Sequence, residues 1–140
     1  MATNYFDYRA GLGNVGSYQS SGKPFLSASI DIPSNNSVIQ IDFPNVTRFI
    51  TIKHTGADEA DLVDMRVGFS ANGISGNAQN NWLILNNQES YSADWRVKSV
   101  YLRVEPIGGS TNATASVIAG LTTIDQVELS HNWTGSEGVG

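Results

Sequence analysis

The sequence predicts an all-β fold, an antiparallel β-sandwich or barrel of jelly-roll-like type with an extended N-terminal arm. Short segments in which apolar and polar residues alternate recur along the chain, and turn residues separate them. No segment keeps its apolar residues at the 3.6-residue period of a helix. Gly, Asn, Ser and Thr supply more than a third of the chain, whereas charged residues supply only 15%. Such polarity without charge favours strands and turns over surface helices.

The 140 residues suit one domain, which we divide into three parts. Residues 1–36 show no clear period, and their aromatic residues stand among glycines, so we expect an extended N-terminal arm. Residues 37–120 form the β-sandwich or barrel body. Residues 121–140 form a C-terminal tail that packs on the body or on a neighbouring subunit.

Seven strands are expected in the body. Alternation is clearest where Met65 and Val67 flank Arg66. Residues 70–81 read as a long polar loop, and residues 106–112 are expected to close a hairpin between the last two strands. The expected strands are 38–43, 46–54, 63–69, 82–85, 91–95, 100–105 and 114–119.

The second of these strands contains one of the two histidines. In residues 46–54, Ile50 and Ile52 share a face with Arg48 and His54. Neither His54 nor His131 has a further metal-ligating residue at suitable spacing. Both histidines are therefore expected to be ordinary surface or edge residues.

The motifs do not indicate an enzyme, a metal site or a cofactor site. The chain has no cysteine, which excludes disulfides and thiol catalysis. Residues 11–16 match G-x-G-x-x-G, but the Gly and Pro residues that follow cannot form the helix that dinucleotide binding requires. The acidic residues from Asp58 to Asp64 lack the ligand spacing of a calcium loop and read as solvated. We therefore expect no catalytic residues, no bound metal and no cofactor.

The charge balance argues against nucleic acid and membrane partners. Only eight Lys and Arg residues are present, they are scattered singly, and the net charge is −5. A protein that follows a phosphate backbone needs a basic face. No apolar run approaches the length of a membrane span, and the N-terminus has no signal-peptide pattern. The chain is expected to be made in a cytoplasm.

The arm is the first candidate binding segment. It is too rich in glycine to fold alone, but it carries aromatic and other side chains typical of protein interfaces. It either docks on a partner or covers an open sheet edge of its own body. The expected capsid or subunit contacts are Tyr5, Phe6, Tyr8, Arg9, Leu12 and Tyr18.

Tryptophans provide the second candidate. Trp82, Trp95 and Trp133, with the Asn-rich loops at 77–81 and 86–87, could stack on a sugar, and Trp82 and Trp133 are the pair chosen as candidate site residues. The competing interpretation places Trp82 and Trp95 in core or sheet-edge packing, which leaves Trp133 as the most exposed.

A specific resemblance appears in residues 8–25, which read YRAGLGNVGSYQSSGKPF. This segment resembles the opening of small virion proteins from tailed marine and cyanobacterial phages. Residues 41–47, IDFPNVT, and the Ile-Thr-Ile strand that follows are similar to the same proteins in organisation.

The resemblance implies a structural protein of the phage particle. It implies a capsid decoration (cement) protein that binds the major capsid protein on the outer shell and stabilises it, with no catalytic residues. We expect self-association as a cyclic homo-oligomer, with a trimer favoured, because closure buries open sheet edges. The expected location is the virion, assembled in the host cytoplasm. The alternative is a carbohydrate-binding or host-surface-binding module on a neck, tail or head fibre.

Overall fold

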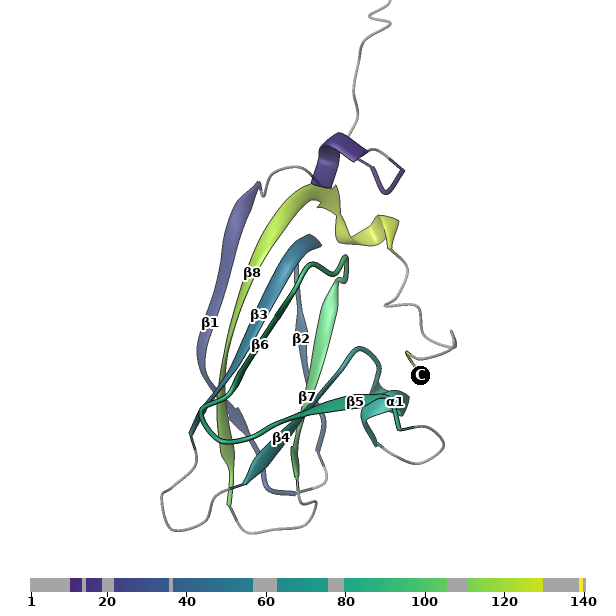
Figure 1. The fold of residues 1–140 in the computed structure, drawn as a ribbon. Helices are drawn as coiled ribbons and strands as arrows, with labels where there is room; N and C mark the ends of the chain where they lie inside the picture. The colour runs from purple at the N-terminus through teal and green to yellow at the C-terminus, as the bar shows by residue number, and fades with distance from the viewer. Residues whose placement is uncertain are drawn as a thin grey trace, which may run out of the picture.

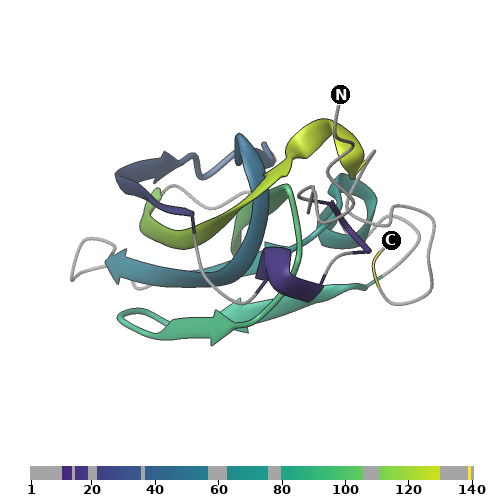
Figure 2. The same cartoon turned by 90° about the horizontal axis from the view of Figure 1, so that it is seen from above.

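A computed structural model describes residues 11–13, 15–18, 22–35, 37–56, 63–75, 80–105, 111–129 and 139. Two four-stranded antiparallel sheets pack face to face, as Figures 1 and 2 show from two directions. Sheet A has the strand order β1-β8-β3-β6, and sheet B has the order β2-β7-β4-β5. The strands are β1 Lys23–Ile32, β2 Ile39–Asp42, β3 Asn45–Gly56, β4 Asp64–Gly68, β5 Trp82–Leu85, β6 Ser90–Ala93, β7 Ser99–Glu105 and β8 Ala113–Asp125.

The strand pairing is that of a jelly roll. β1 pairs with β8, β2 with β7, β3 with β6 and β4 with β5, all antiparallel. This is the pattern of one long hairpin rolled into two sheets, the eight-stranded form that combines two Greek keys. The all-β sandwich prediction is confirmed, and the barrel alternative is wrong because β1 and β6 remain the edges of sheet A.

The core lies between the sheets and comes from the alternating residues that the sequence indicates. Sheet A contributes Ile50, Ile52 and Val117, and sheet B contributes Met65 and Leu102, all of which are fully buried. Each such side chain stabilises the fold by about 1.5–3 kcal/mol relative to an exposed position. A second, smaller cluster of Val46, Ile124 and Leu129 closes one end of the sandwich.

The expected hairpin between the last two strands is wrong. β7 pairs with β2 and β4 in sheet B, whereas β8 pairs with β1 and β3 in sheet A. The chain therefore passes from one sheet to the other after Glu105. A period-2 pattern reports which face of a strand is apolar, but not which sheet the strand joins.

The observed sheets extend beyond the predicted body at both ends. Residues 23–32, in the predicted arm, form the ten-residue edge strand β1 on β8. β8 continues to Asp125, into the predicted tail, before the 3-10 turn η2 (Gln126–Glu128). β1 carries a register shift between Ser27 and Ile30 with Ser29 at φ 56°, and this bulge hides the alternation from a period-2 reading.

The predicted face of β3 is only partly correct. Ile50, Ile52 and His54 do share the buried face, but Arg48 is exposed. Thr47 pairs with Leu121 and Phe49 with Gly120, so Arg48 is the extra residue of a β-bulge, and it turns outward.

His54 is fully buried, so the prediction of a surface or edge histidine is wrong. Its Nδ1 accepts a hydrogen bond from the Gly56 amide at 3.2 Å, and its Nε2 donates to the Val63 carbonyl at 2.7 Å. Both ring nitrogens are therefore satisfied inside the core, which is what permits burial of a polar ring. The bonds connect the end of β3 to the residue that precedes β4.

Candidate functional site

The structure describes two of the six predicted arm contacts. Leu12 packs against the cluster of Val46, Ile124 and Leu129, and its carbonyl accepts a hydrogen bond from Arg96 at 3.4 Å. Tyr18 ends the short 3-10 turn η1 (Val15–Tyr18). Leu12 therefore ties the described end of the arm to its own body. Tyr5, Phe6, Tyr8 and Arg9 lie outside the described residues.

Of the predicted sugar-stacking pair, only Trp82 lies among the described residues; Trp133 lies outside them. Trp82 is half-buried, and the Cζ atom of Arg66 lies 3.8 Å from the centre of its ring. Trp82 also borders a pocket of about 260 Å³ with Asn80, Asn81 and Tyr91 among its lining residues. Asn80 and Asn81 line this pocket together with Trp82, but the guanidinium of Arg66 occupies one face of the indole.

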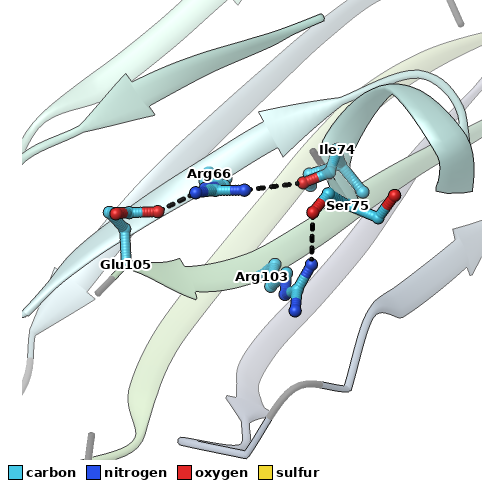
Figure 3. Close-up of polar contacts among 5 residues, drawn as sticks. All are labelled: Arg66, Ile74, Ser75, Arg103 and Glu105. Carbon is cyan, nitrogen blue, oxygen red and sulfur yellow. Dashed lines mark hydrogen bonds and ion pairs between the residues drawn. The ribbon is translucent and has the colours of Figure 1, made fainter. Parts of the chain in front are cut away.

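Arg66 belongs to a polar cluster on the outer face of sheet B (Figure 3). Its Nε donates to a carboxylate oxygen of Glu105, and its Nη1 donates to the carbonyl of Ile74 at 3.0 Å. Arg103, directly opposite Arg66 on β7, donates from Nη1 to the carbonyl of Ser75 at 3.0 Å. Both carbonyls belong to the last residues of the short helix α1 (Ala71–Ser75). Guanidinium groups at a helix C-terminus satisfy carbonyls that have no partner within the helix.

The two arginines are not equivalent. Burial, then the charge of Arg66, lowers the pKa of Arg103, and Glu105 opposes this effect. The Nε of Arg103 is buried without a hydrogen-bond partner. Arg66, by contrast, has an ion pair, a carbonyl and an aromatic face as partners. The cluster therefore attaches α1 to sheet B mainly through Arg66.

α1 also corrects the prediction of an unbroken polar loop over residues 70–81. Ser70 caps the helix, since its Oγ accepts a hydrogen bond from the Gly73 amide at 3.0 Å. The same hydroxyl donates to the carbonyl of Val139 at 2.6 Å. Val139 therefore contacts the residue that caps α1.

An open pocket surrounds Trp95. It has a volume of about 520 Å³ and is lined by Thr47, Arg48, Asp94, Trp95 and Arg96. Trp95 is 49% exposed, and its indole N–H donates to the hydroxyl of Tyr91 at 2.7 Å. The pocket lies on the β6–β7 connection, at the same end of the sandwich as η1 and η2 (Figure 1). We call it the Trp95 pocket.

Buried Thr47 holds the backbone of this pocket. Its Oγ1 lies 2.7 Å from the Trp95 carbonyl and accepts from the Val97 amide at 3.1 Å. The Thr47 amide donates to the Val97 carbonyl at 3.0 Å. The segment that carries Trp95 is not a strand, yet these bonds fix it on β3. The bulge at Arg48 lies next to Thr47 and directs the guanidinium into the same pocket.

The outer face of sheet A carries an uncharged patch. Leu26, Ile118, Thr51 and Ser92 form one row across all four strands. Leu26 is 70% and Ile118 43% exposed. Pro24, Gly120 and Phe49 form the adjacent row, also without charge. We call these two rows the sheet A patch. Contiguous exposed apolar residues on a sheet face provide a surface that another protein can cover.

The sequence placed Trp95 among three candidate sugar-stacking tryptophans but not in the chosen pair, because its position beside a strand favoured packing. No local signal marked its exposure, because charged Asp94 and Arg96 on either side of an aromatic residue fit a half-buried strand as well as an exposed segment. The contribution of Arg48 had no local signal, since it depends on a bulge.

Comparisons with known proteins leave the class open. No protein-family model matches the chain, and no curated protein matches it significantly. In the part of the chain that the structure describes, no three His, Cys, Asp or Glu side chains are grouped as metal ligands. No described helix has the length and apolar character needed to cross a membrane.

Proposed function

We propose that this protein is a structural component of a phage particle, a decoration protein that binds the major capsid protein on the outer shell and stabilises it. The sheet A patch carries the proposal, because exposed Leu26 and Ile118 lose contact with water when a protein surface covers them. Burial of apolar surface contributes about 25 cal/mol per Å². The resemblance of residues 8–25 and the jelly-roll topology, an architecture used by viral capsid domains, give independent support.

The proposal includes a cyclic homo-oligomer, with a trimer favoured, located in the virion. Strand β1 is ten residues long and forms an edge of sheet A. Edge strands present unpaired backbone groups that favour pairing with another chain, and cyclic closure covers them in every copy. The predicted arm residues Tyr5, Phe6, Tyr8 and Arg9 would add contacts to the shell or to a neighbour.

Quantitative mass spectrometry of purified particles tests the class of protein. Hundreds of copies per particle are expected of a shell component. About a dozen copies would move the protein to the neck, tail or a fibre. Absence from the particle would overturn the proposal.

The sheet A patch has its own test in capsid rebinding. The double variant Leu26→Lys/Ile118→Lys should lose binding to stripped capsids, because two charges replace the apolar row. Thr123→Lys is the matched control, since Thr123 is exposed on β8 but lies outside the patch. Equal binding by the double variant and the control would show that another surface meets the capsid.

The arm is tested by deletion of residues 2–18, which should abolish capsid binding while the β body stays folded. Because Leu12 packs on the body, alanine substitutions at Tyr5, Phe6, Tyr8 and Arg9 provide a variant that keeps that contact. Binding that is unchanged in both variants would remove the arm from the proposal.

A second candidate function is a carbohydrate-binding or host-surface-binding module on a neck, tail or head fibre. The half-exposed Trp95 in an open pocket favours it. A strictly monomeric protein with glycan binding would favour this candidate over the shell component. A glycan array without signal would remove it.

A further inference from the structure

The side chains around Trp95 combine an open aromatic face with unequal charge. The Trp95 pocket holds two guanidinium groups, from Arg48 and Arg96, and one carboxylate, from Asp94. Guanidinium groups thus outnumber carboxylates among its described lining residues, although the chain has a net charge of −5. We propose that the Trp95 pocket binds a saccharide that carries a carboxylate, such as a uronic or sialic acid unit.

The indole accounts for the saccharide part of this ligand. A pyranose ring presents one face of C–H groups, and a half-exposed indole offers a flat apolar surface of matching size. The ring is held in place by its bond to Tyr91, and its backbone is held by Thr47. A site that is rigid before binding loses less conformational entropy when the ligand arrives.

The arginines account for the carboxylate. A guanidinium forms paired, charge-assisted hydrogen bonds with a carboxylate, and these are stronger than bonds to a neutral hydroxyl. Asp94 can accept hydrogen bonds from sugar hydroxyls beside them. A neutral sugar would offer the Arg48 guanidinium no charged partner.

Arg48 and Asp94 are available for these roles. Across the described ranges, neither side chain has a hydrogen bond or an ion pair. Arg48 reaches the pocket only because the β3 bulge turns it outward, and bulges commonly direct a side chain toward a binding site. Structural packing explains neither the bulge nor the exposed indole.

This inference rests on the second candidate function and is independent of capsid binding. The probes are an oligosaccharide of glucuronic acid with its carboxyl-reduced counterpart, and sialyllactose with lactose. The full-length protein is titrated with each probe by calorimetry and by tryptophan fluorescence.

A dissociation constant in the micromolar to millimolar range is expected for at least one acidic probe. Loss of the carboxylate should weaken binding about tenfold, and added salt should also weaken it. Trp95→Ala should abolish binding, and Arg48→Ala should weaken it about tenfold. Lys53→Ala removes the same charge from an exposed site on the same strand and should bind like the wild type.

The outcomes separate the inference from the functions proposed above. Equal affinity for an acidic probe and its neutral counterpart would overturn the inference but retain a sugar site. Loss of binding in Trp82→Phe, with folded Trp95→Ala unaffected, would place the site in the other pocket. No binding of any probe would overturn the inference, while the glycan array still decides the second candidate function and the particle copy number decides the first.

Discussion

Three buried polar side chains connect parts of the backbone that strand pairing does not join. His54 holds the residue before β4, Thr47 holds the segment that carries Trp95, and Arg66 holds the end of α1. The polar atoms that make these contacts all have hydrogen-bond partners, and this is what allows the side chains to be buried. At the scale of single residues, polar bonds determine the positions of the non-strand segments.

Replacement of His54 by Leu is expected to lower the free energy of unfolding by about 1–3 kcal/mol. The apolar side chain fits a buried position, but it leaves the Val63 carbonyl and the Gly56 amide without their partner. Urea denaturation measures the loss. Lys53→Leu, one residue away on the exposed face of β3, is the control and should change stability by less than about 0.5 kcal/mol.

Replacement of Thr47 by Val is expected to cost about 1–2 kcal/mol and to loosen the Trp95 segment. Valine has nearly the same shape but lacks the hydroxyl that binds the Trp95 carbonyl and the Val97 amide. The readouts are thermal denaturation and the accessibility of Trp95 to a fluorescence quencher. Thr47→Ser keeps the hydroxyl and should keep the wild-type accessibility of Trp95 to the quencher. Equal accessibility in the valine and serine variants would contradict the role assigned to the hydroxyl.

Elements outside the two sheets are attached by few contacts. Helix α1 is only five residues long, far shorter than a helix that is stable by itself. Its last carbonyls accept from Arg66 and Arg103, and the Ser70 hydroxyl caps its first turn. The helix therefore depends on tertiary contacts with sheet B.

Arg66→Met is expected to destabilise the protein by about 2–3 kcal/mol, since Glu105 and the Ile74 carbonyl both lose their partner.

Arg103→Met is expected to lower the free energy of unfolding by much less than Arg66→Met does. Because the pKa of Arg103 is lowered on folding, the folded state binds its proton less tightly than the unfolded state does. At every pH below that lowered pKa, the charge of Arg103 therefore lowers the free energy of unfolding. Methionine carries no charge, so Arg103→Met removes this unfavourable contribution.

Thermal denaturation of the two variants, with hydrogen exchange at α1, measures this difference. Faster exchange at α1 is expected in Arg66→Met. Equal destabilisation by both substitutions would contradict the unequal roles assigned to the two arginines.

Gly73→Ala tests the contact between α1 and the C-terminal end. Alanine favours helices over glycine by about 1 kcal/mol. A Cβ atom at this position, however, would lie 2.5 Å from the Val139 carbonyl and 2.8 Å from the Ser70 Oγ. We expect net destabilisation by about 1 kcal/mol, measured by chemical denaturation. Asn72→Ala, on the exposed side of the same helix, should be neutral or stabilising.

At the scale of the whole molecule, β8 is the longest of the described strands, with 13 residues. It lies inside sheet A between β1 and β3, and five of its residues contribute to the main core. Most of its partners are distant in sequence, as expected when the first and last strands pair. Such long-range pairing folds slowly, on a scale of about milliseconds to seconds.

A chain that ends at residue 112 is therefore expected to be unfolded. It lacks β8, so β1 loses its partner and β3 loses one of its two neighbours. Far-UV circular dichroism and the dispersion of amide NMR signals measure the outcome. A chain that ends at residue 129 keeps both clusters of buried residues and should fold, with a loss of about 1 kcal/mol for the Ser70 contact to Val139.

Local patterns located most of the strands. Met65 and Val67 alternate with Arg66, and Val100, Leu102 and Val104 alternate with polar neighbours, so their strands were predictable within about two residues. β1 was not predictable in this way, because its bulge at Ser29 interrupts the alternation. The candidate site was predicted less well, since Trp95 needs an exposed loop and Arg48 needs a bulge.

By itself, the sequence determined that the protein is all β and which faces of most strands are apolar. It also excluded cysteine chemistry. These properties depend only on composition and on residues close together in the chain. Only the tertiary structure decided that β7 and β8 lie in different sheets, that His54 is buried, and that Arg48 joins Trp95 in one pocket. The physical reason is that pairing, burial and pocket formation depend on contacts between residues far apart in the chain, and no local period records such contacts.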